Sequence, residues 1–138
     1  MAIFLNSSAT GVILKIATVD LSAYVKSISV NQSFDEVEVT AMGATAHQFA
    51  PGLYADSLDV ELLNDFAAAK VYATLKAAIG TTVAVTVQQT SATTSATNPL
   101  FSSTILVNNL AFINGAPGDY SSQTIHFTCN SKWVITES

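Results

Sequence analysis

Hydrophobic and polar residues alternate along most of the chain with the two-residue period of a β-strand. The alternating segments are rich in β-branched residues, which strands favour. One face of each segment would therefore meet a core while the other meets solvent. The segments expected to form strands are Val12–Val19, Val25–Ser33, Asp35–Ala41, Ser57–Leu63, Thr81–Gln89, Leu100–Ile113 and Tyr120–Val134.

One segment has a helical period instead. Its apolar residues recur at the three- and four-residue spacing that places them along one side of a helix. Asn64 or Asp65 is suited to cap the start, and Gly80 is suited to end the helix in a left-handed conformation. We therefore expect one helix from Asn64 or Asp65 to about Ile79. Its apolar stripe comprises Ala68, Val71, Tyr72, Leu75 and Ile79.

The segment Ala41–Asp56 is an unusually long connection between two expected strands. Hairpin loops usually run about 2–5 residues. Gly43 and the pair Pro51–Gly52 are turn signals, so we expect a loop throughout. The loop also carries apolar residues that a solvated connection does not need, which favours contact with another copy of the chain. These residues are Met42, Phe49, Leu53 and Tyr54.

Together the elements predict a mainly β protein, an antiparallel barrel or sandwich with one α-helix packed on its side. The length of 138 residues suits a single domain, residues 1–138, and no internal repeat or linker interrupts it. Residues 1–11 would form an N-terminal arm and residues 133–138 a C-terminal tail. Trp133 would dock that tail onto the same subunit or onto a neighbouring one.

Composition favours a homo-oligomer that does not bind nucleic acid tightly. The chain is 49% hydrophobic and only 11% charged, against about 25% charged in average soluble domains. Its net charge is −5, with five scattered lysines and no arginine. Proteins that read DNA or RNA need clustered cations to neutralise phosphates. An acidic surface would instead let DNA pass without adhering to it.

The sequence carries no expected signal for secretion, membrane insertion or disulfide formation. The single cysteine, Cys129, cannot form an internal disulfide. The first residues, MAIFLNSSATG, lack the basic region of a secretory signal. No apolar stretch approaches the roughly 18–20 residues that a membrane helix needs. We therefore expect a protein made in a cytoplasm, without a membrane anchor, that stays soluble until it assembles.

Catalytic chemistry is not expected. His47 and His126 are the only imidazoles, and no nucleophile motif accompanies them. A group of carboxylates lacks the spacing of a calcium loop and is better explained as a solvated strand face with a helix cap. We therefore expect no catalytic, cofactor-binding or metal site. The carboxylates are Asp56, Asp59, Glu61 and Asp65.

Five short motifs occur in order along most of the chain. They are VDLSAYVKSISV at Val19–Val30, DEVEVTAMG at Asp35–Gly43, FAPGL at Phe49–Leu53, SLDV with the following DF at Ser57–Phe66, and SATNP at Ser95–Pro99. Each motif is short, so the specificity lies in their order. In that order they resemble the tail tube proteins, or major tail proteins, of long bacteriophages with non-contractile tails.

The resemblance implies a barrel-like β-sandwich with one helix. Its subunits would form hexameric rings that stack into a hollow tube conducting DNA, located in the virion tail and assembled in the host cytoplasm. The loop Ala41–Asp56 and the two chain ends would reach between rings. Expected partners are further copies of the chain and other tail proteins, such as the tape measure and the terminator. The chain departs from the family in lacking arginine, so ion pairs between subunits would rely on its lysines.

Two sets of residues follow from this assembly. The lumen would repel a phosphate backbone through one of two acidic strand faces, either Glu36 with Glu38 or Asp59 with Glu61. The contacts between rings would use Met42, His47, Phe49, Pro51, Leu53, Tyr54 and Trp133.

Two other functions stay open. A tail terminator or head–tail connector would share the subunit fold but would not polymerise past one ring. A small carbohydrate- or ligand-binding β-sandwich would use Trp133, Tyr54 and Tyr72 as stacking surfaces. An enzyme is the least favoured function.

Overall fold

A computed structural model describes residues 11–137. Within them the chain is mainly β, with antiparallel sheets and one α-helix, as the sequence pattern predicts. The elements in chain order are β1 (Ile13–Ile16), β2 (Val19–Asp20), the 3₁₀ turn η1 (Ser22–Tyr24), β3 (Val25–Asn31), β4 (Phe34–Glu38), β5 (Phe49–Tyr54), β6 (Ser57–Leu63), α1 (Val71–Ala78), β7 (Thr82–Gln88), β8 (Leu100–Leu106), β9 (Ser122–Cys129) and β10 (Val134–Thr136).

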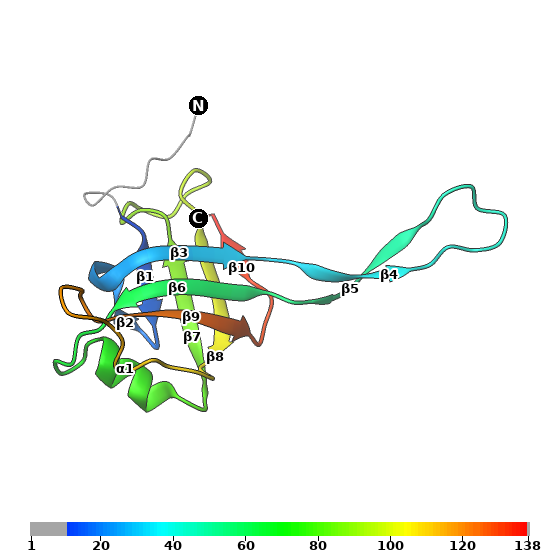
Figure 1. Cartoon of the computed structure of the whole chain (residues 1–138). Helices are drawn as coiled ribbons and strands as arrows, with labels where there is room; N and C mark the ends of the chain where they lie inside the picture. The colour runs from blue at the N-terminus through cyan, green and yellow to red at the C-terminus, as the bar shows by residue number, and fades with distance from the viewer. Residues whose placement is uncertain (1–10, 138) are drawn as a thin grey trace.

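The main sheet folds over on itself into a sandwich-like body. Its strand order is β2-β1-β7-β8-β9-β6-β3, and β10 also pairs with β8. The strands β3, β6 and β9 form one layer, which crosses the layer of β1, β7 and β8 in Figure 1. The sheet bends at β8, which pairs with β9 through Ile105 and Leu106 and with β10 through its opposite half. Within the described residues β2 and β3 do not pair with each other, so the sheet does not close into a barrel.

The core lies between these layers and follows the two-residue alternation of the strands. On β6 the side chains of Leu58, Val60 and Leu62 are buried, while Asp59 and Glu61 point outward. Ile125 and Phe127 of β9 are buried in the same way. Full burial of such a side chain contributes about 1.5–3 kcal/mol. The body is therefore stabilised by apolar positions that the sequence pattern identifies.

The helix is shorter than the sequence predicts. It begins at Val71, because the preceding segment forms a turn organised by Asp65. The Asp65 carboxylate accepts a hydrogen bond from the Ala67 amide at 2.9 Å. Ala69 then adopts a left-handed φ of 59°, which an α-helix does not permit. At the other end Gly80 has a φ of 80°, in agreement with its predicted role.

Three predicted strands are also shorter or interrupted, and Tyr120–Val134 keeps its strand only over Ser122–Cys129. The segment Val12–Val19 is a hairpin rather than one strand, because Ala17 and Thr18 adopt left-handed φ values of 52° and 68° between β1 and β2. The segment Leu100–Ile113 keeps its strand only as far as Leu106.

Candidate assembly surface

A two-stranded arm, residues 34–54, projects from the body (Figure 1). It continues the hairpin of β3 and β6, because β4 follows β3 and β5 precedes β6. The strands of the arm pair antiparallel from Glu38 opposite Phe49 to Phe34 opposite Tyr54, with a shift of register between Phe34 and Glu36. No second layer of the described body packs on the arm, and every residue of β4 is exposed.

The sequence prediction of a loop over Ala41–Asp56 is wrong for its second half, which forms β5. Pro51 and Gly52 were interpreted as a turn, yet both lie within the strand. Both strands of the arm are edges, where the missing amide of a proline is tolerated. Gly52 allows close approach, since a Cβ added there would lie 3.0 Å from the Asp35 carbonyl oxygen. The pair therefore permits a narrow ribbon rather than a reversal of the chain.

Apolar side chains stand exposed on both faces of the arm. Residues directly opposite each other share a face, so Val37 with Ala50 lies on one face and Glu38 with Phe49 on the other. The exposed fraction is 81% for Leu53 and 56% for Phe49. Isolated two-stranded ribbons are marginally stable in water. A ribbon with this much exposed apolar surface is therefore a strong candidate for a contact surface.

The arm is joined to the body by a buried carboxylate. Asp56 is 3% exposed, and its two oxygens accept hydrogen bonds from the amides of Ser33 at 3.0 Å and Trp133 at 2.8 Å. The Ser33 hydroxyl donates to the Ala55 carbonyl at 2.9 Å. Each strand of the hairpin is thereby tied to the C-terminal segment where the arm leaves the body. The expectation that Asp56 belongs to a solvated strand face is therefore wrong, because in the sequence it resembles any polar residue before a strand.

Aromatic contacts strengthen the same region. Phe34 and Tyr54 pack edge to face with ring centroids 5.8 Å apart. The Lys132 ammonium lies 4.7 Å from the centroid of the Tyr54 ring, a favourable cation–π geometry. The base of the arm is therefore more firmly held than its tip.

The structure brings together most of the predicted interface residues but excludes one. Trp133 is 2% exposed, and its indole N–H donates to the Ser57 carbonyl at 3.3 Å. Its assignment to an interface between subunits is wrong, because the C-terminal tail folds back as β10 and places the indole in the core of its own chain. The other six residues all lie exposed on the arm: Met42, His47, Phe49, Pro51, Leu53 and Tyr54.

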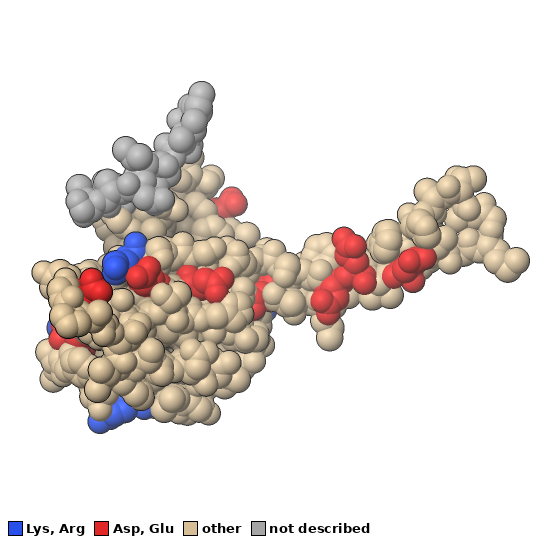
Figure 2. All heavy atoms as spheres, viewed as in Figure 1, with Lys and Arg blue, Asp and Glu red and all other residues tan. Residues whose placement is uncertain are grey.

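The two acidic pairs lie on different parts of the molecule. Glu36 and Glu38 stand on the arm, where Figure 2 shows a row of carboxylates without lysines, and Glu38 pairs with His47 Nδ1 at 3.2 Å. Asp59 and Glu61 stand on the outer face of β6, within a broad sheet layer. The two pairs therefore lie on different halves of one hairpin, the arm and the body, and Figure 2 shows carboxylates on both halves.

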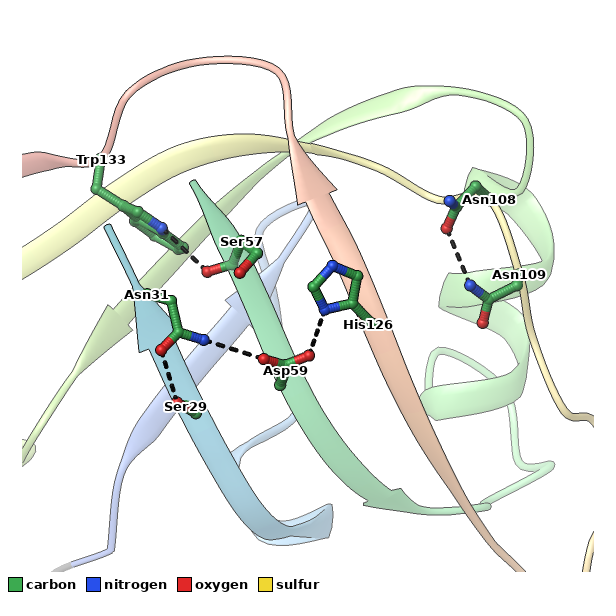
Figure 3. Close-up of polar contacts among 8 residues, drawn as sticks. All are labelled: Ser29, Asn31, Ser57, Asp59, Asn108, Asn109, His126 and Trp133. Atoms are coloured by element: carbon green, nitrogen blue, oxygen red, sulfur yellow. Dashed lines mark hydrogen bonds and ion pairs between the residues drawn. The ribbon is translucent and has the colours of Figure 1, made fainter. Parts of the chain in front are cut away.

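The outer face of β6 carries a polar network (Figure 3). Asp59 accepts a hydrogen bond from Asn31 Nδ2 at 3.0 Å and also contacts His126 Nδ1. Glu61 pairs with Lys26 at 3.4 Å. His126 is exposed and Asp59 is half-buried, and they are joined to neighbouring polar strand residues rather than to a nucleophile. The network stabilises cross-strand contacts on a solvated face.

The described residues were also compared with the requirements of a metal site, a membrane helix and a ligand pocket. Between residues 11 and 137 there is no group of three or more His, Cys, Asp or Glu side chains that could hold a metal ion. The helix of that region is too short to cross a membrane. A hollow of about 460 Å³ on the outer face of β1 and β7 is lined by neutral residues and Lys15.

The three aromatic residues of the ligand-binding alternative do not share a surface. Trp133 is buried in the core, and Tyr54 lies at the base of the arm. Tyr72 of α1 packs between Phe66 and Phe112, with ring centroids 5.0 and 5.5 Å apart. No single ligand can stack on all three of the proposed rings.

No protein-family model and no curated protein sequence matches this chain.

Proposed function

We propose that the chain is a structural subunit that assembles into stacked rings, forming a hollow tube of the kind found in long bacteriophage tails. The observation that carries the proposal is the projecting arm with apolar side chains exposed on both faces. The order of the sequence motifs supports the same function. In this proposal the subunit has no enzymatic activity, and the tape measure and terminator proteins are its other partners in the virion tail.

The physical reason is the cost of leaving the arm uncovered. Burial of apolar surface contributes about 25 cal/mol per Å², and the arm offers that surface only to another molecule. An assembly of identical subunits can bury this surface, because each copy supplies one arm and covers the arm of another copy. The low fraction of charged residues, 11%, is in keeping with a chain that covers part of its surface in an assembly.

The channel wall is the second part of the proposal. A wall requires a broad surface, and the layer of β3, β6 and β9 is broad where the arm is narrow. We therefore favour Asp59 and Glu61 over Glu36 and Glu38 as the acidic lining, since carboxylates there would repel passing DNA. A tube reconstruction with Asp59 and Glu61 on the outer wall would contradict this assignment.

Electron microscopy of the purified protein over a range of concentrations tests the proposal. We expect long tubes from the unaltered chain. The variant Leu53→Asp should not form them, because it places a charge on the exposed apolar surface of the arm. The matched control Thr97→Asp adds the same charge to an exposed position on the body and should leave the tubes intact. Single rings would indicate a terminator or connector instead, and a persistent monomer would refute self-assembly.

A further inference from the structure

A second exposed apolar surface lies on the body around the start of α1. We call it the aromatic patch and define it by Phe66, Tyr72, Phe112, Ile113 and Tyr120. Phe66, Tyr72 and Phe112 form a continuous row of rings. The exposed fraction is 90% for Ile113, 86% for Tyr120 and 56% for Phe66. Most of this apolar surface is left in contact with solvent rather than with the core of the chain.

Partly buried hydrogen bonds hold the segments that carry the patch. Gln123 is 1% exposed, and its amide nitrogen donates to Asn64 Oδ1 at 2.8 Å. Its amide oxygen accepts from the Ala111 amide at 3.1 Å. Asn64 Nδ2 donates to the Ser121 hydroxyl at 2.8 Å. These contacts hold the backbone next to Phe66, Phe112 and Tyr120. The side chains of the patch are therefore carried by well-ordered segments.

The patch and the arm lie at opposite ends of the same layer. Strand β6 begins at Ser57, beside the base of the arm, and ends at Leu63, beside the patch. Its seven residues span about 20 Å at the usual rise of a strand. Figure 1 shows α1 at the end of the body away from the arm. A contact between the arm of one copy and the patch of the next can therefore repeat without closing on itself.

The charges of the two surfaces are complementary. The arm carries three carboxylates, Asp35, Glu36 and Glu38, and no lysine. Two of the five lysines lie on or beside α1, and Lys76 Nζ is 5.3 Å from the centroid of the Tyr72 ring. Figure 2 shows lysines at the α1 end and carboxylates along the arm.

The patch also has nearby carboxylates of its own. Asp65 is engaged by the Ala67 amide and the Tyr24 hydroxyl, which hold its pKa below the ordinary value. Asp119 stands exposed in the turn beside Tyr120. The lysines Lys70 and Lys76 are therefore the groups that favour an acidic partner, while the aromatic rings favour an apolar one.

We propose that the aromatic patch is the surface that receives the arm of a second copy. The arm supplies both features that the patch would bind, exposed apolar side chains and carboxylates without lysines. The inference rests on the proposed function, because it specifies where the self-assembly contact lies. It goes further by naming both halves of one head-to-tail contact.

Photo-crosslinking locates the contact. The photoreactive residue p-benzoylphenylalanine replaces Phe49 on the arm or, as a control, Thr97 on the body. The concentrated protein is irradiated and the joined peptides are identified by mass spectrometry. We expect the probe at position 49 to join residues 64–79 or 107–121 of another copy, and the control probe to join neither. Joining to residues 1–10, to the hollow beside Lys15 or to another arm would overturn the inference.

Charge reversal tests the same pairing independently. Lys70→Glu with Lys76→Glu should raise the concentration required for assembly by about tenfold or more, since like charges opposed at an interface are strongly unfavourable. Glu36→Lys with Glu38→Lys should do the same. Combining the four substitutions should return that concentration to within about threefold of the unaltered chain. Lys15→Glu is the control and should change it little.

The outcomes separate the two proposals. Tubes that form from the unaltered chain and from both charge-reversed variants alike would refute the patch while leaving self-assembly in place. Failure of the combined variant to recover, with its fold intact by circular dichroism, would also contradict the pairing. No particle larger than a monomer from the unaltered chain would refute self-assembly and the patch together.

Discussion

The two halves of one long hairpin have different relations to the rest of the chain. In the body half, β6 buries Leu58, Val60 and Leu62 against a second layer. In the arm half, Val37 and Phe49 have the same alternating strand geometry but remain exposed. The comparison shows that a two-residue period specifies a strand and its faces. It does not specify whether another layer will cover them.

The boundary between the halves lies at polar residues, Asn31–Ser33 on one strand and Asp56 with Ser57 on the other. At that position Asp56 accepts hydrogen bonds from the amides of Ser33 and Trp133. The buried carboxylate ends the contact with the second layer and fixes where the hairpin leaves the body. A change at the joint should therefore affect the body, whereas a change beyond it should affect assembly.

The largest expected effect comes from removing a phenylalanine ring from the core of the body, compared with removing one from the arm. Phe127→Ala should lower the free energy of unfolding by about 3–5 kcal/mol, because it leaves a cavity in the core. Phe49→Ala, on the arm, should change it by no more than about 0.5 kcal/mol. Urea unfolding of both monomeric variants measures the difference. Equal losses would show that the arm packs on the body.

The joint should give the next largest effect. Asp56→Ala leaves the buried amide of Trp133 and the partly buried amide of Ser33 without their acceptor, and should lower the free energy of unfolding by about 2–4 kcal/mol. Urea unfolding measures it, and Asp35→Ala on the arm is the matched control. A change below about 1 kcal/mol at Asp56 would contradict its structural role.

Shortening the arm should separate stability from assembly. Replacing residues 39–48 by Asn-Gly joins the paired residues Glu38 and Phe49 with a two-residue turn. We expect the free energy of unfolding to change by less than about 1 kcal/mol, because no core residue is removed. Tubes should be lost in electron microscopy. Tubes of unchanged length would show that the distal arm is not the contact.

The smallest expected effect concerns a carboxylate of the body. The hydroxyl and the amide of Ser22 hold the pKa of Asp20 below its ordinary value of 3.8. The stabilisation is therefore present above that value and is lost as the pH falls through the lower pKa of the folded state. Because Asp20 is well exposed, Asp20→Asn should cost less than about 1 kcal/mol at pH 7 and progressively less as the pH falls below 3.8.

Thermal unfolding across this pH range measures the effect. The variant Asp119→Asn controls for the loss of one charge at an exposed turn. A loss in Asp20→Asn that grows as the pH falls would contradict the assignment.

The sequence predicted much of the fold for local reasons. Alternation in β6, β7 and β9 indicated the strands and their buried faces, because side chains on a strand point in opposite directions in turn. The helix and its end at Gly80 followed from spacing and from the conformational freedom of glycine. The exposed arm residues, from Met42 to Tyr54, were selected because a solvated loop does not need apolar groups.

Only the tertiary structure decided which of these surfaces are covered. Trp133 and the arm residue Phe49 are both large aromatic groups, yet folding of the tail buries one and leaves the other exposed. Pro51 and Gly52 lie in a strand because pairing with Glu36 and close approach to Asp35 override a local turn signal. The aromatic patch brings Phe66 and Tyr72 against Phe112, which is distant from them in sequence. Such relations depend on contacts between distant segments, which the period of a single segment does not contain.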